Sequence, residues 1–182
     1  MKELRFHGRR EPRYDRVAPF VAAPKLLAEA ALIEGKHVQF RPPWLFLRGF
    51  TPETAHLRMD EAPIETYQQE SFLDAVIVTD PTVISEVNVV GGLKPGGLLL
   101  INSEVFLALT DKARLVTLDL SDVAKAHKAE LAPVLVGALI ALMKLVQLHT
   151  VEALLKNAGG KDRMVKAGLE ALHAGFESTR GK

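Results

Sequence analysis

The pattern of hydrophobic and polar residues changes period several times along the chain, and it predicts strands alternating with helices. Near-continuous apolar runs at Leu73–Thr79 and Leu98–Ile101 are typical of parallel strands that are covered on both faces. Thr54–Met59 alternates cleanly between apolar and polar residues, which predicts a half-buried strand. Three further extended segments complete the predicted sheet: Lys2–His7, Lys36–Phe40 and Ala113–Leu118.

Helical periodicity fills much of the remaining sequence. Ala22–Glu34 carries a broad apolar stripe, and Gly35 follows it at the position where a C-terminal capping glycine belongs. Asp80-Pro81 ends a strand and predicts a helix that Gly91-Gly92 closes, with Asp80 capping its free amides. The last third of the chain predicts helices that pack together on one face of the sheet: Val134–His149, Val151–Asn157 and Asp162–Phe176.

This alternation of strands and helices indicates an α/β fold, a three-layer Rossmann-like domain with a mostly parallel central sheet. The 182 residues contain no repeat, low-complexity tract or linker, so we expect residues 1–182 to form a single domain. Met1–Arg16 is too charged for a signal peptide, and Leu131–Met143 is too short to span a bilayer. We therefore expect a cytoplasmic protein.

Composition narrows the chemistry that the chain can perform. It has no cysteine, which excludes disulfides, thiolate metal sites, iron–sulfur ligation and a thiol nucleophile. The formal net charge of +1 implies neither a nucleic acid nor a membrane as partner. The six histidines are scattered without metal-ligand spacing, so strand or surface positions explain them better than a metal site. Asp119 and Asp122 flank Ser121 at a strand-to-helix junction, where helix capping is a better explanation than acid–base catalysis.

A basic run lies near the end of the first predicted strand, and a tryptophan stands alone in the next long loop. The basic run, which consists of Arg9, Arg10, Arg13 and Arg16, fits either a solvated loop or a patch that docks an anion or a partner. Trp44, which follows two prolines, fits either an aromatic anchor at an interface or a lid over the local core.

Taken in order, these segments resemble the gamma subunit, or gamma domain, of 2-oxoacid:ferredoxin oxidoreductases. The opening strand with Gly8-Arg9, the helix with Leu26-Leu27-Ala28-Glu29-Ala30 and the pair Arg48-Gly49 are similar to that family. Later stretches match as well: Leu73–Pro81, Gly92–Asn102, Leu135–Leu139 and Ala167–Gly175. The resemblance covers nearly the whole chain, and the order and spacing of the motifs carry it.

The resemblance implies a subunit of an enzyme that oxidatively decarboxylates a 2-oxoacid to an acyl-CoA and passes electrons to ferredoxin. It implies a role in structure and assembly, with partners that are alpha-, beta- and delta-type subunits and, through the complex, ferredoxin. Thiamine diphosphate, iron–sulfur clusters and coenzyme A belong to the complex, and we expect this chain to bind no cofactor itself. The family's glycine loop maps to Gly8, Arg9, Arg10 and Arg13, and its second loop maps to Arg48 and Gly49, which makes these residues the candidate contacts for a cofactor.

Both candidate loops depart from the family pattern. The first reads Gly8–Arg13, with Arg10, Glu11 and Arg13 in place of glycines and with Pro12, which cannot donate an amide hydrogen. Because Pro19 and Pro24 interrupt the helix that follows, we expect its regular part to begin well away from the loop. The sequence therefore predicts that this loop does not hold a dinucleotide or pyrophosphate in the usual manner.

The second loop has become apolar, which suggests a surface for another protein. Leu45, Phe46, Leu47 and Phe50 are too many apolar residues for a free surface loop and predict a docking surface in a stable hetero-oligomer. Two other functions stay open. One is a diverged stand-alone module that binds an anion or a partner on the same fold. The other is an unrelated nucleotide-dependent α/β enzyme.

Overall fold

The computed structural model describes residues 1–9, 17–43, 51–65 and 72–180. A six-stranded sheet forms its centre, with the strand order β2-β3-β1-β4-β5-β6. The strands are β1 (Lys2–Gly8), β2 (His37–Arg41), β3 (Glu53–Asp60), β4 (Leu73–Val78), β5 (Leu93–Asn102) and β6 (Arg114–Leu118). Each of them contains or closely overlaps a segment whose hydrophobic pattern predicts a strand.

The central sheet is mostly parallel, as the sequence predicts. β1, β4, β5 and β6 pair in parallel, so their carboxyl ends meet at one edge. β3 runs antiparallel to both of its neighbours, β1 and β2. This mixed order places the start of the chain in the middle of the sheet, and β1 is buried along most of its length.

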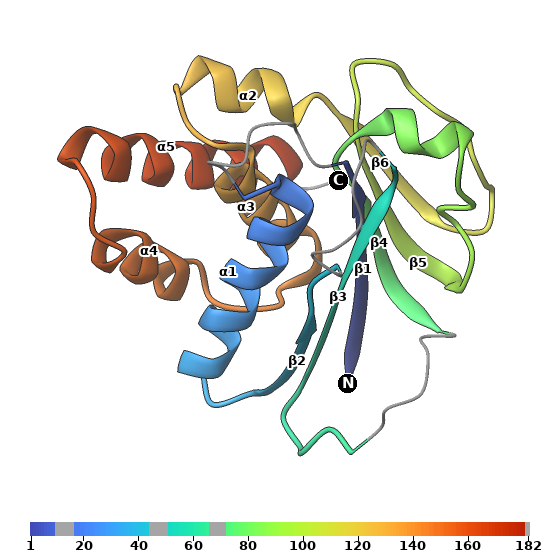
Figure 1. Cartoon of the computed structure of the whole chain (residues 1–182), viewed down its shortest axis with the longest axis horizontal. Coiled ribbons are helices and arrows are strands. Elements are labelled where there is room, and N and C mark those ends of the chain that lie inside the picture. The colour runs from blue at the N-terminus through green and yellow to red at the C-terminus, as the bar shows by residue number, and fades with distance from the viewer. Residues whose placement is uncertain (10–16, 44–50, 66–71, 181–182) are drawn as a thin grey trace.

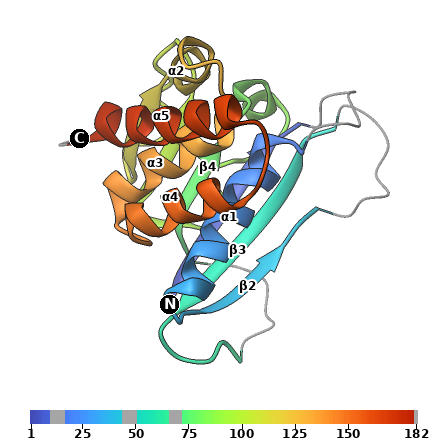
Figure 2. The same ribbon diagram turned by 90° about the vertical axis from the view of Figure 1, so that its left-hand side faces the viewer.

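Within the described residues, five α-helices pack on one face of the sheet, and Figure 2 shows the helical layer to one side of β3. Their buried residues form one apolar cluster with the sheet side chains that point toward them, such as Leu4, Phe6 and Ile77. The helices are α1 (Pro19–Ile33), α2 (Leu120–Ala126), α3 (Leu131–Met143), α4 (Leu148–Asn157) and α5 (Asp162–Thr179). α3 is apolar almost all round because it lies between the sheet and α5.

The opposite face of the sheet carries a thinner layer. A 3₁₀-helix, η1 (Pro81–Ser85), and the segments around it cover β4 and β5 there (Figure 1). Val83 and Val89 from this layer pack on Val76, Val78, Leu99 and Ile101 of the two strands. Because both faces of β4 are covered, its sequence is nearly continuously apolar.

Several helical boundaries differ from the predicted ones. The helix expected between Asp80-Pro81 and Gly91-Gly92 is only the 3₁₀-helix η1, and turns follow it. The run expected as one helix over Val134–His149 is broken at Lys144, which adopts a left-handed φ of 54°, and α4 begins at Leu148. The last predicted helix continues to Thr179.

The expectation that Pro19 and Pro24 interrupt the first helix is wrong. Pro19 occupies the first position of α1, where its fixed φ suits a helix and its missing amide hydrogen costs nothing. Pro24 lies inside α1 and is buried. At the other end of the helix, Gly35 has the positive φ of 79° that a capping glycine provides, as the sequence predicts.

Strand β5 is longer than its apolar run. It begins at Leu93 and passes through Pro95-Gly96-Gly97, ahead of the predicted strand Leu98–Ile101. The pairing of β4 with β5 shifts register between Leu73 and Ala75, which accommodates this irregular stretch. Gly96 has a φ of 75° there, a conformation that favours glycine.

Candidate functional site

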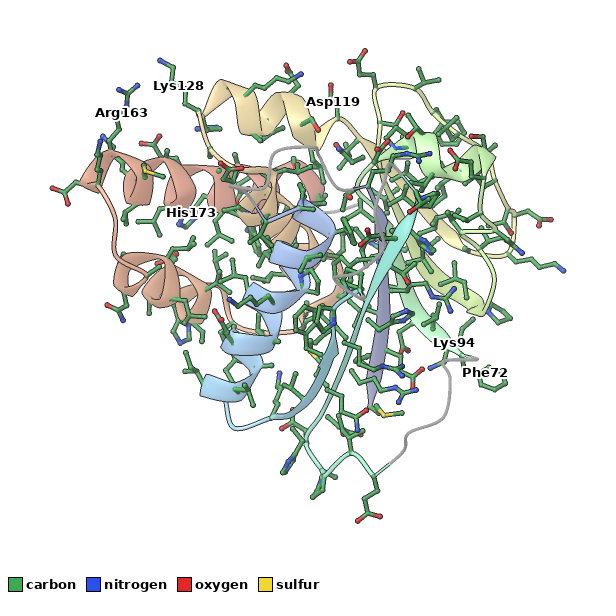
Figure 3. The ribbon with its side chains drawn as sticks, viewed as in Figure 1. Phe72, Lys94, Asp119, Lys128, Arg163 and His173 are labelled. Atoms are coloured by element: carbon green, nitrogen blue, oxygen red, sulfur yellow. The ribbon has the colours of Figure 1, made fainter. Side chains whose placement is uncertain are left out.

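An open crevice of about 650 Å³ lies at the edge where the parallel strands end. In open α/β sheets this edge is the usual place for a ligand. The side chains around the crevice come from the ends of β5 and the segments that follow β1, β4 and β6, and from the start of α2; they include Arg9, Thr79, Asp80, Asn102, Asp119 and Ser121. Figure 3 labels Asp119 at the start of α2, at this edge.

Asn102, the last residue of β5, joins the ends of two strands to α2. Its side-chain Nδ2 donates to the backbone oxygen of Thr79 at 2.9 Å and to Oγ of Ser121 at 2.8 Å. Its Oδ1 accepts from the backbone N–H of Ser121 at 3.0 Å. Both N–H donors of the side-chain amide are therefore used within the chain, so the amide fixes the floor of the crevice rather than offering a donor to a ligand.

Two aspartates at the crevice cap the helical segments that begin there. Oδ1 of Asp80 accepts from the backbone N–H of Thr82 at 2.9 Å and from its hydroxyl at 2.7 Å. Oδ1 of Asp119 accepts from the backbone N–H of Asp122 at 2.8 Å, which confirms the capping role that the sequence favours for Asp119. Amides that could otherwise bind an anion are thus occupied by the chain's own carboxylates.

Arg9 is bound to η1 across the edge of the sheet. Its Nε donates to the hydroxyl of Thr82 at 2.9 Å, and its Nη2 forms an ion pair with Glu86. Asp80 adds a second carboxylate, with Nε and Oδ2 3.7 Å apart. The guanidinium is therefore largely neutralised and held in place by the chain itself.

Gly8 is required by close packing rather than by backbone conformation. A Cβ atom added there would lie 2.5 Å from Oγ1 of Thr79 and 2.6 Å from Cδ1 of Phe20 in α1. The glycine lets the end of β1 approach both β4 and α1 closely. The absence of a side chain at Gly8 therefore serves this packing contact.

The other predicted contacts for a cofactor lie outside the described residues: Arg10, Arg13, Arg48 and Gly49. The same holds for Trp44 and for the apolar residues Leu45, Phe46, Leu47 and Phe50. Of the six candidates, the structure thus describes two, Gly8 and Arg9, and both are engaged in contacts within the chain. Their binding role remains a prediction.

The sequence analysis did not predict a cluster of polar side chains on the face of the sheet opposite the α-helices. Alternation in β3 suggests that Arg58 faces solvent, but its side chain is only 3% exposed and pairs with Glu3 of β1, with Nε and Oε1 3.0 Å apart. Nη1 of Arg5 donates to the backbone oxygen of Gly91 at 2.9 Å. The strand register, which places Glu3 opposite Arg58, was the missing information.

His7 lies on the same face and is buried, and among the described residues neither ring nitrogen has a hydrogen-bond partner. Burial, together with the smaller effects of nearby Arg5 and His56, lowers the pKa of His7 from 6.5 to about 4. At neutral pH the ring is therefore uncharged. The sequence places His7 in a strand, but only the burial of this face explains its altered titration.

The described ranges hold no group of three or more histidine, aspartate or glutamate side chains arranged to bind a metal ion. Within the same ranges, no helix has the length and apolar character that crossing a membrane requires.

Comparison with known proteins identifies the family. Residues 20–178 match the family described as pyruvate ferredoxin/flavodoxin oxidoreductase, and the chain belongs to this family. The common gamma subunit of pyruvate/ketoisovalerate oxidoreductases from Thermococcus litoralis is 41% identical over 104 residues, which are 57% of this chain and 53% of that protein. The aligned region thus spans about half the length of such relatives.

Longer alignments extend the likeness at lower identity. The pyruvate synthase subunit PorC from Thermotoga maritima is 28% identical over 98% of this chain and 94% of its own length. The crystal structure of the PORC subunit of pyruvate oxidoreductase from the same organism superimposes with a TM-score of 0.78 over 97% of this chain and 95% of that one. The gamma subunit of a keto/oxoacid ferredoxin oxidoreductase from Geobacter sulfurreducens, 22% identical over 98% and 95% of the two chains, shares the fold with a TM-score of 0.76.

Proposed function

We propose that this chain is the gamma-type subunit of a 2-oxoacid:ferredoxin oxidoreductase complex in the cytoplasm. Such a complex oxidatively decarboxylates a 2-oxoacid to an acyl-CoA and transfers electrons to ferredoxin. The observation that carries the proposal is the likeness to a PorC subunit along 98% of this chain and 94% of the relative. The partners are alpha-, beta- and delta-type subunits, ferredoxin is reached through the complex, and neither nucleic acid nor membrane is a partner.

The role within the complex is structural rather than catalytic. Thiamine diphosphate, iron–sulfur clusters and coenzyme A are held by other subunits. Cysteine is absent from the 182 residues, so this chain cannot supply the thiolates that ligate iron–sulfur clusters. The crevice residues support this division, because Asp80 and Asp119 accept hydrogen bonds from amides at its helix starts and Arg9 is paired with Glu86 and Asp80.

The alternative is a stand-alone module that grips an anion with its arginine run. Arg9, the described member of that run, binds Thr82 of η1 and the flanking carboxylates of Asp80 and Glu86 instead. This observation favours the subunit over the anion-binding module.

Reconstitution tests the proposal. The thiamine-binding and iron–sulfur subunits of the same host are produced with and without this chain, and 2-oxoacid-dependent reduction of ferredoxin is measured with coenzyme A present. We expect the chain to join the complex and to raise its yield and activity. Recovery of a fully active complex that excludes the chain would contradict the proposal.

A further inference from the structure

Two adjacent apolar side chains point outward from the loop between β5 and β6. Val105 is 65% exposed and Phe106 is 69% exposed, although both are large hydrophobic residues. Val105 also lines the crevice at the carboxyl edge of the sheet. Single exposed apolar residues are ordinary, but a neighbouring pair beside a crevice is the arrangement of an anchor that fills a pocket on another protein.

Hydrogen bonds within the loop hold the backbone that leads into this pair. The backbone N–H of Ser103 donates to the backbone oxygen of Leu118 at 2.9 Å, and its Oγ accepts from the backbone N–H of Val105 at 3.1 Å. Leu107 and Leu109 then pack into the apolar cluster on the η1 side of the sheet. The segment therefore sends two apolar side chains inward and two outward. A fixed backbone reduces the entropy that binding through the outward pair would cost.

The charge next to the pair distinguishes between possible occupants. Glu104 is exposed and directly precedes Val105. In a twofold self-association centred on Val105 and Phe106, the two copies of Glu104 would lie close together and repel each other. A different protein that offers a lysine or arginine beside an apolar pocket would instead complement this carboxylate.

We propose that Val105 and Phe106 are the anchor by which a partner subunit docks on the carboxyl edge of the sheet. The partner offers an apolar pocket that takes both side chains, with a lysine or arginine at its rim facing Glu104. The inference rests on the proposed function, because the partner is a subunit of the same oxidoreductase complex. It adds the docking surface, which the family likeness does not specify.

The experiment compares two double variants in the complete complex. Val105→Asp with Phe106→Asp alters the proposed anchor. Leu32→Asp with Ile33→Asp is the matched control, since these adjacent residues at the end of α1 are 59% and 63% exposed. Each variant is produced with the partner subunits of its host, and subunit stoichiometry and affinity are measured by light scattering after gel filtration and by titration. Thermal unfolding of each isolated chain checks that it folds.

We expect the anchor variant to fold normally and to associate about tenfold more weakly or worse, while the control associates as the wild type does. Glu104→Lys should also weaken association, by a few-fold, and Glu104→Gln less. Normal association of the anchor variant would overturn this inference but leave the proposed function intact. Failure of the wild-type chain to join the complex would instead refute the proposed function and, with it, this surface. Self-association of the isolated chain through Val105 and Phe106 would show that the occupant is a second copy, which also contradicts the proposal.

Discussion

Gly137 of α3 and Gly175 of α5 bring the two helix backbones into reciprocal contact. A Cβ atom at Gly137 would overlap the backbone oxygen of Leu172 in α5, and one at Gly175 would overlap the backbone oxygen of Val134 in α3. The distances from these Cβ atoms to the backbone oxygens would be well below the 3.0 Å at which a Cβ atom clashes. Because the obstacles are backbone atoms, no side-chain rotation relieves them. The packing of the helical layer therefore depends on these two glycines.

Adding one methyl group at either position should destabilise the protein. We expect Gly137→Ala and Gly175→Ala each to lower the free energy of unfolding by about 2–3 kcal/mol, since α3 and α5 must move apart. The matched control is Gly168→Ala in α5, where nothing lies within 4 Å of the added atom. There the higher helix propensity of alanine should raise stability by about 0.5–1 kcal/mol. Urea denaturation measures all three, and equal effects at the three sites would refute this explanation.

The ion pair between Glu3 and Arg58 should matter more than exposed pairs because its side chains are 10% and 3% exposed. Glu3→Gln leaves a buried guanidinium without its full countercharge, and we expect a loss of about 3 kcal/mol. The double variant with Arg58→Met should cost less than the sum of the two single changes. Glu29→Gln is the control, because Glu29 pairs with Lys25 at the surface of α1 and should change stability by less than about 0.5 kcal/mol.

Stability should fall in acid through His7. Its pKa of about 4 in the folded chain lies below its ordinary value of 6.5, so the unfolded chain binds more protons between these values. The stability is therefore complete above pH 6.5 and is lost as the pH falls toward 4, by up to about 3 kcal/mol. His7→Gln should flatten this part of the stability profile measured by urea denaturation. His37→Gln, at an exposed histidine, should keep the wild-type slope; the same slope for both variants would contradict the assignment.

Local signals in the sequence were sufficient for most of the sheet and for the cap at Asp119. Apolar runs and alternation locate strands because the side-chain period of two does not depend on distant residues. The break at Lys144 carries no such signal: no glycine or proline marks it, and the apolar periodicity continues through it. The segment after Pro81 is rich in β-branched residues, which lower helix propensity. It packs on β4 and β5 as a short 3₁₀-helix followed by turns.

The site was harder to predict than the fold because its chemistry depends on partners far apart in sequence. In the sequence Arg9 resembles a free cation, but the fold brings Thr82 of η1 and Glu86, which follows η1, to it. Arg58 resembles a solvent-facing residue until the register of β1 and β3 brings Glu3 opposite it. In both cases the sequence shows a charged side chain that could bind a ligand, and the fold pairs that charge with a carboxylate of the same chain.

The loop after β1 should bind no dinucleotide, pyrophosphate or coenzyme A tightly. The sequence replaces its glycines and removes an amide donor at Pro12, and the structure commits Arg9 to η1. Because that guanidinium is only partly exposed, we expect Arg9→Ala to lower stability by about 1 kcal/mol, and to leave ligand binding unchanged. Lys125→Ala is the control, since Lys125 lines the same crevice from an exposed position in α2 and should leave stability unchanged. Calorimetric titration with nucleotides and coenzyme A measures binding directly.

Sub-micromolar binding by the isolated chain that survives Arg10→Ala and Arg13→Ala would mean that backbone amides still hold phosphate here. That result would contradict the prediction that the missing glycines and the occupied helix caps prevent such binding.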